Sequence, residues 1–228
     1  MIPAKWLPLL ILLGTGLRAQ HKFVIKDGSG LYDAEISVAT CDKEECEGKA
    51  VVTLYKKGTS ARFQSFPSDN LDFYLNKDQQ PSVNIVQLYN EQSPLIFNDF
   101  NFDGTEDLAI RNGNESSYGG PSYDVYVFNS TRQQFVPSEE LTGLAHENLG
   151  MFEVDPVRKR LITYSKSGCC WHLTTEYAVV PQKGLVKVDE LEEDATGGDN
   201  VTVTKSKLIN NKWNKTIKTY PIKEYYKD

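Results

Sequence analysis

The sequence predicts an all-β fold of antiparallel hairpin and meander sheets, arranged as a sandwich or a small propeller-like fold. Short segments rich in Val, Ile, Tyr, Phe and Thr recur between turn residues along most of the chain. Several of them alternate apolar and polar residues, as residues 123–128 do, which is typical of half-buried antiparallel strands. Helical periodicity of useful length is nearly absent, and only the segment from Ser138 to Leu141 predicts a single helical turn.

Residues 1–20 predict a cleaved signal peptide. Lys5 supplies a positive n-region, residues 7–13 form a short apolar run, and cleavage is expected after Ala19 or Gln20. The apolar run is too short for a membrane span of about 20 residues, and no later segment competes with it. We therefore expect an exported protein, periplasmic or secreted, with no membrane span.

The charge of the chain bears on its partners. The sequence contains 25 Lys and Arg against 31 Asp and Glu, a formal net charge of −6. Removal of Lys5 and Arg18 with the signal peptide would bring it to about −8. Contacts to phosphates need a basic face, so we expect no nucleic-acid partner.

The rest of the chain divides into two parts. Residues 21–80 predict an N-terminal β extension and linker, with strands at 31–38 and 51–55 and a polar stretch at 68–81 that is typical of a loop. Residues 81–228 predict the main domain, with strands at 83–89, 107–111, 123–128, 160–164, 176–180 and 201–208. The last hairpin, 201–220, is rich in lysine, which is typical of a sheet edge.

Export determines how the four cysteines are interpreted. In an oxidising compartment, disulfides are favoured over metal ligands or nucleophiles. We favour a bridge between Cys41 and Cys46 across a short acidic loop, which leaves Cys169 and Cys170 as a vicinal pair. Pairing between the two regions stays open, because four cysteines allow three connectivities.

The most specific motif is the segment 99–107, DFNFDGTED, which fits the calcium-loop pattern D-x-N-x-D-G-x-x-D. Gly104 permits the sharp turn, and the expected Ca²⁺ ligands are Asp99, Asn101, Asp103, Thr105 through its carbonyl, and Asp107. Position twelve is Ile110 rather than Glu, and the flanks 95–97 and 108–110 have strand character. We expect a calcium loop that joins two strands. The alternative is an Asp- and Asn-rich turn without metal.

A glycine-rich polar loop follows at 112–123, with Tyr118 at its tip and Tyr123 at the start of the next strand. One large aromatic side chain among small residues suits insertion into the cleft of another protein, because Tyr gives contact area at low entropic cost. The alternative is an ordinary long hairpin loop.

The sequence gives no positive case for an enzyme. Cys170 and His172 lack an evident orienting acid and favour a disulfide-stiffened strand. The acidic run 190–194 favours a solvated face over a catalytic carboxylate pair. Nucleophile elbows, phosphate loops and dinucleotide fingerprints are absent from the sequence.

Three segments carry a resemblance to a known family: 98–108 (NDFNFDGTEDL), 118–126 (YGGPSYDVY) and 164–172 (YSKSGCCWH). Together they resemble bacterial periplasmic immunity proteins against lysozyme-like effectors delivered by a bacteria-killing type IV secretion system. These proteins are similar in fold to the periplasmic inhibitors of invertebrate-type lysozyme. The resemblance covers roughly residues 82–187.

The resemblance implies an all-β, calcium-binding inhibitor whose loop enters the glycan cleft of a peptidoglycan hydrolase and blocks it sterically. Carried onto this sequence, the calcium ligands are Asp99, Asn101, Asp103 and Asp107. The inserted loop is Ser117, Tyr118, Gly119 and Gly120, supported by Tyr123. The residue order leaves open which tyrosine inserts, and we place Tyr118 first. Ser167 and Gly168 form a second candidate loop. The acidic charge suits a cationic lysozyme, because opposite potentials speed association.

Two other functions remain open. One is a calcium-stabilised β domain of the FG-GAP or integrin-propeller type that binds a carbohydrate or a surface protein. Such propellers repeat the calcium loop in each blade, whereas this sequence shows it once. The other is a secreted hydrolase that uses Cys170 or a carboxylate pair.

Overall fold

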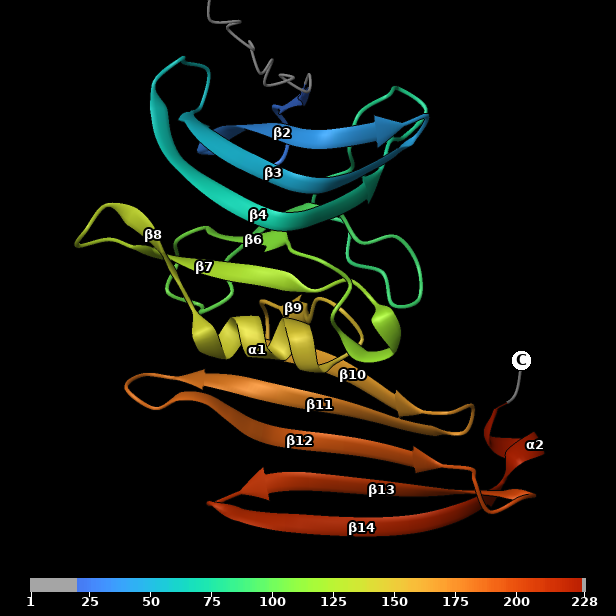
Figure 1. Ribbon diagram of the computed structural model, residues 1–228. Coiled ribbons are helices and arrows are strands. Elements are labelled where there is room, and N and C mark those ends of the chain that lie inside the picture. The colour runs from blue at the N-terminus through green and yellow to red at the C-terminus, as the bar shows by residue number, and fades with distance from the viewer. Residues whose placement is uncertain (1–19, 227–228) are drawn as a thin grey trace, which may run out of the picture.

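The computed structural model describes residues 20–226, in which three antiparallel sheets stack as layers (Figure 1). The predicted all-β fold class is confirmed. The predicted signal peptide lies, except for Gln20, outside the described residues. Within residues 20–226, none of the helices combines the length and apolar character that crossing a membrane requires.

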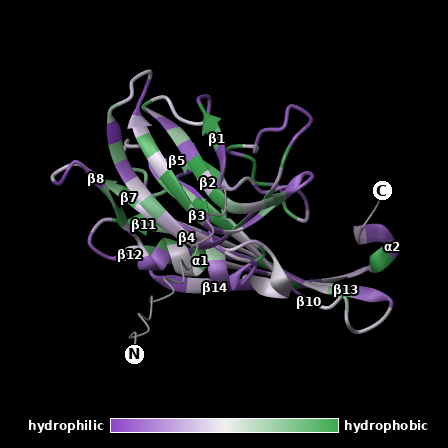
Figure 2. Ribbon diagram, turned by 45° about the horizontal axis from the view of Figure 1, so that its top comes forward, coloured by the Kyte–Doolittle hydropathy of each residue, from purple (hydrophilic) through white to green (hydrophobic). Residues whose placement is uncertain are grey.

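The first sheet has the strand order β1-β2-β3-β4. Its strands are β1 His21–Ile25, β2 Tyr32–Asp42, β3 Glu45–Lys56 and β4 Arg62–Tyr74. Hydrophobic and hydrophilic residues alternate along these strands (Figure 2), and Ile36, Val52 and Leu54 are fully buried. The alternation gives the sheet one apolar face, which must be covered by another layer.

The second sheet supplies that cover. Its order is β5-β6-β7-β8, and its strands are β5 Leu95–Asn98, β6 Asp107–Arg111, β7 Tyr123–Asn129 and β8 Gln134–Pro137. Leu95, Leu108 and Phe135 share one buried cluster with the inward residues of the first sheet. Residues 21–74 therefore share a hydrophobic core with the sheet that follows.

A second core lies on the other side of the β5–β8 sheet. It is covered by the helix α1 (Glu139–Glu147), which buries Leu141 and Leu144, and by part of the third sheet. The third sheet has the order β14-β13-β12-β11-β10-β9. Its strands are β9 Glu153–Asp155, β10 Arg160–Ser167, β11 Trp171–Val180, β12 Gly184–Asp194, β13 Asn200–Ile209 and β14 Lys212–Pro221, with α2 (Ile222–Tyr225) after them. Phe100 and Phe152 meet edge to face in this core, with ring centroids 5.4 Å apart.

Several predicted elements differ from the structure. Residues 83–89 form no strand, because Asn84 and Tyr89 adopt positive φ values of 61° and 62°. The polar stretch predicted as a loop from residue 68 begins inside β4. The single predicted helical turn is the start of the nine-residue helix α1, which is capped by Ser138. The acidic run 190–194, expected to form a solvated face, lies half-buried in β12.

Tyr123 links the β5–β8 sheet to the segment before it. Its ring is fully buried, and its hydroxyl donates a hydrogen bond of 2.9 Å to the carbonyl of buried Ser93. We expect Tyr123→Phe to lower the free energy of unfolding by about 1–2 kcal/mol, because the Ser93 carbonyl loses its donor. Urea denaturation measures the change. The same substitution at exposed Tyr74 should stay within about 0.5 kcal/mol, and equal effects at both sites would contradict the expectation.

Candidate functional site

The loop predicted to meet a partner joins β6 to β7. Its tip is a short 3₁₀ turn, Ser117–Gly119, in which Tyr118 adopts a left-handed conformation with φ 60°. The Tyr118 side chain is 64% exposed, whereas that of Tyr123 is fully buried. Only Tyr118 of the two can therefore reach a partner, and Tyr123 supports the loop from below.

The loop is fixed at its base. Ser122 is fully buried, and its hydroxyl donates to the Asn112 carbonyl at 2.7 Å while accepting from the Glu115 amide at 3.1 Å. The side chain of Asn112 accepts hydrogen bonds from the backbone amides of Asp69 and Asn70 on β4. The base of the loop is thus tied to the first sheet.

The tip of the loop is held as well. The Ser117 amide donates to the Asn148 carbonyl at 3.0 Å, and its hydroxyl donates to the Glu147 carbonyl at 3.1 Å, at the end of α1. A Cβ on Gly120 would lie 2.8 Å from the Ser116 hydroxyl oxygen. Gly119 has φ +68°, which disfavours larger residues. The small residues around Tyr118 are thus required by the shape of the loop.

The structure brings the two candidate loops together. The amide of Gly168 donates a hydrogen bond of 2.7 Å to the Tyr118 hydroxyl oxygen. The ammonium of Lys166 lies 4.8 Å from the ring centroid of Tyr118 and 4.8 Å from that of Tyr89. We call these four residues, Tyr89, Tyr118, Lys166 and Gly168, the Tyr118 edge.

A disulfide stiffens the turn that contributes Gly168. Cys169 and Cys170 are bonded to each other between β10 and β11, and Cys41 is bonded to Cys46 between β2 and β3. The predicted bridge between Cys41 and Cys46 is therefore confirmed. With all four oxidised in the structure, Cys170 offers no thiolate for catalysis.

Two adjoining cavities lie along the Tyr118 edge. One, of about 330 Å³, is lined by Tyr89, Tyr118 and Lys166 among others. The second, of about 480 Å³, is lined by Tyr74 and Arg111 among others. Both cavities are bordered by Asn90, Gln92 and Pro121. The two cavities therefore share a border, and each is lined by at least one tyrosine.

The predicted calcium loop lies between β5 and β6, at the opposite end of β6 from Tyr118. Its acidic side chains fold over its own backbone. Asp99 accepts from the amides of Asp103 and Gly104 at 3.0 and 2.9 Å, and Asp103 accepts from the Thr105 amide at 2.8 Å. The Asn101 oxygen also accepts from the Asp103 amide at 2.9 Å.

Asp107 closes the loop from inside the protein. It is fully buried, and its carboxylate accepts from the amides of Phe100 and Asn101 on one oxygen and of Phe128 on the other. Burial raises the pKa of Asp107 to about 7, and these hydrogen bonds oppose the rise.

The donors of this loop fit calcium in type. Each carboxylate oxygen has more than one acceptor position, so the backbone hydrogen bonds leave room for a cation. Ca²⁺ prefers such hard oxygen ligands, and a buried carboxylate without a basic partner favours a cation beside it. The acidic side chains of the loop lie farther apart than in a formed metal site. Across residues 20–226, no three His, Cys, Asp or Glu side chains gather closely enough to hold a metal ion.

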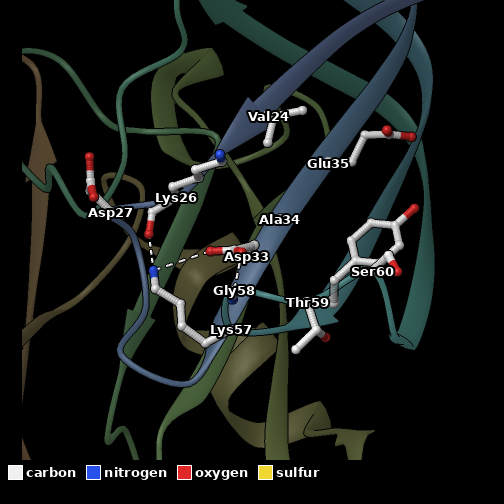
Figure 3. Close-up of a pocket in the computed structure, with 11 residues that line it drawn as sticks. Val24, Lys26, Asp27, Asp33, Ala34, Glu35, Lys57, Gly58, Thr59 and Ser60 are labelled. Carbon is white, nitrogen blue, oxygen red and sulfur yellow. Dashed lines mark hydrogen bonds and ion pairs between the residues drawn. The ribbon is translucent and has the colours of Figure 1, made fainter.

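Another cavity lies away from these loops, on the outer side of the first sheet (Figure 3). It has a volume of about 610 Å³. Its main charges satisfy each other, since Lys57 pairs with Asp33 at 3.2 Å and the Gly58 amide donates to the same carboxylate. The predicted site residues are absent from its lining, and we assign it no function.

Sequence reasoning missed two residues of the Tyr118 edge. Tyr89 falls in the segment predicted as a strand, and Lys166 belongs to the segment YSKSGCCWH without being given a role. In the sequence, Lys166 could be noticed only as part of the segment YSKSGCCWH. Its aromatic neighbours Tyr89 and Tyr118 come from two other loops, so no local pattern connects them to it.

Comparison with known proteins adds a fold relationship. No family model matches the chain, and no curated protein matches it. Among solved structures, the chain is similar to the structure of a Xanthomonas type IV secretion system related protein, with 20% sequence identity and a TM-score of 0.62. The match covers 88% of this chain and 94% of the other. At this identity, the similarity establishes a shared fold.

Proposed function

We propose that the protein is an exported, calcium-binding inhibitor of a lysozyme-like peptidoglycan hydrolase. Tyr118 inserts into the active-site cleft of the enzyme and blocks access of the glycan. The inhibitor carries out no reaction of its own. The observation that carries this proposal is the Tyr118 edge, where an exposed aromatic side chain protrudes from a loop fixed at both its base and its tip.

The rigidity of the edge supports inhibition by insertion. A partner gains affinity from a side chain that is already ordered, because less conformational entropy is lost on binding. Tyr118 is ordered before binding by the Gly168 amide and by Lys166. Its exposed ring also has the chemistry of an interface hot spot.

Export and the type IV secretion association belong to the same proposal. The two disulfides support an oxidising compartment, in agreement with the predicted signal peptide. The similar fold of a type IV secretion system related protein supports a role as an immunity protein against effectors of such a system. The calcium ligands we propose are Asp99, Asn101, Asp103, Thr105 and Asp107.

One feature favours a second candidate function. Tyr74, Tyr89 and Tyr118 are 63%, 60% and 64% exposed along the two adjoining cavities. Exposed aromatic faces beside side-chain amides also suit direct binding of a carbohydrate. Sedimentation of the protein with insoluble peptidoglycan, without any hydrolase, tests this alternative.

The proposed function is tested by an inhibition assay. The mature protein, in the presence of calcium, is mixed with lysozymes of several classes and with any lysozyme-like hydrolase encoded beside its gene. Turbidity loss of peptidoglycan suspensions reports hydrolase activity. We expect stoichiometric inhibition of at least one enzyme. Unchanged activity of every enzyme, with co-sedimentation on peptidoglycan, would instead support carbohydrate binding.

A further inference from the structure

Lys166 is a fixed cation at the centre of the Tyr118 edge. Its ammonium lies 4.8 Å from the ring centroids of both Tyr89 and Tyr118, and its side chain is half-buried between them. Within residues 20–226, the ion pairs involve other basic groups, and no carboxylate lies within 4.0 Å of this ammonium. Lys166 is therefore held in place by aromatic rings rather than by an anion of the protein.

This arrangement positions the charge without neutralising it. The negative face of an aromatic ring attracts a lysine ammonium, and two rings restrict the freedom of a flexible side chain. The residue opposite Lys166 on β11 is His172, which supplies no negative charge. In a chain with a formal net charge of −6, this edge carries a localised positive charge that can attract an anion.

We propose that Lys166 recognises a carboxylate inside the cleft of the target hydrolase. This inference rests on the proposed function and deepens it. Glycoside hydrolases commonly cleave with a pair of carboxylates at the centre of the cleft. Because Tyr118 and Lys166 line the same 330 Å³ cavity, insertion of Tyr118 carries the ammonium into that cleft. Lys166 then pairs with a catalytic carboxylate while Tyr118 fills the glycan site.

The pairing also gives the inhibitor specificity. A cleft that lacked the matching carboxylate would leave Lys166 desolvated and without a partner, which opposes binding. The acidic charge of the whole protein attracts a cationic enzyme at long range, whereas Lys166 acts at contact distance. The two opposite charges of the inhibitor thus serve separate steps.

The test uses the inhibited hydrolase and four inhibitors: wild type, Lys166→Gln, Lys166→Arg and Lys183→Gln. Lys183 lies exposed in the turn after β11, at the far end of that strand from Gly168. Dissociation constants are measured by calorimetry with the native enzyme and with the enzyme whose catalytic carboxylate is changed to the amide. Thermal unfolding of each inhibitor reports its fold separately.

We expect Lys166→Gln to weaken binding of the native enzyme about tenfold, in the range of a lost charged hydrogen bond. Lys166→Arg should retain most of the affinity, since it keeps the charge and stacks on tyrosine. Lys183→Gln should bind as wild type does. The amide enzyme should bind wild type more weakly but should not distinguish wild type from Lys166→Gln, because the paired charge is already absent.

Three other results would overturn the inference, and they distinguish its failure from failure of the proposed function. If wild type inhibits but Lys166→Gln binds equally well, Lys166 has no recognition role and the proposed function stands. If Lys166→Gln weakens binding of the amide enzyme by the same factor as binding of the native enzyme, Lys166 contacts a group other than the catalytic carboxylate. If wild type binds no hydrolase, the proposed function fails, and the inference fails with it.

Discussion

Replacing Tyr118 with alanine is expected to weaken binding of the target hydrolase by about a hundredfold or more and to abolish inhibition at micromolar concentrations. The ring is 64% exposed in the free protein and would be buried in the cleft. Its conformation is fixed before binding by the Gly168 amide and by Lys166. Truncation therefore removes both the buried contact area and the preorganisation of the neighbouring cation. Inhibition titrations and calorimetry measure the loss.

Two further variants identify the cause of the loss of binding in Tyr118→Ala. Tyr118→Phe keeps the ring but leaves the Gly168 amide without its acceptor, and should weaken binding less than tenfold. Trp213→Ala removes another exposed aromatic ring, on β14 at the far edge of the third sheet, and should bind as wild type does. Full inhibition by Tyr118→Ala would show that the protein is an inhibitor but blocks the enzyme with another surface.

Local sequence patterns predicted the strands in which the order of apolar and polar residues matches the buried and exposed sides of the strand. The alternation at 123–128 and the segment 201–208 correspond closely to β7 and β13. Residues 83–89 are rich in Val, Ile, Leu and Tyr, yet Asn84 donates to the Gly28 carbonyl and accepts from the Phe97 amide, at 2.7 Å each. These bonds to distant segments take the chain out of strand geometry.

In β4, a segment predicted as a loop is instead part of a strand. Asp69 and Asn70 look like loop residues, but their amides donate to the Asn112 side chain while the strand pairs with β3. Long-range pairing of this kind leaves no local signal. The same limit applies to the candidate site. The tip residues could be identified from their composition, whereas the bond between Tyr118 and Gly168 joins positions 50 residues apart.

The proposed calcium loop, residues 99–107, allows a prediction that is independent of any hydrolase. Removing calcium with a chelator should destabilise the protein, and adding it back at about 100 times its dissociation constant should restore about 2.7 kcal/mol. For a chain of this size, that corresponds to a rise of roughly 5–10 °C in melting temperature. The reason is electrostatic: without a cation, the like charges of Asp99 and Asp103 repel each other within one short loop, and burial disfavours the charged form of Asp107. Calorimetric melting in chelator and in calcium measures the shift.

The variant Asp103→Asn separates metal binding from the fold of the loop. Asparagine keeps the oxygen that accepts from the Thr105 amide, removes one charge and loses the exposed hydrogen bond from the Asn101 side chain. The calcium-dependent shift should therefore shrink, while the stability of the metal-free protein changes little. Asp78→Asn, in an exposed turn away from the loop, should leave the shift unchanged. The proposed calcium loop and Tyr118 lie at opposite ends of β6. Calcium should therefore raise the melting temperature while changing the affinity for the hydrolase little. Superimposable melting curves with and without calcium would show that residues 99–107 form a metal-free turn.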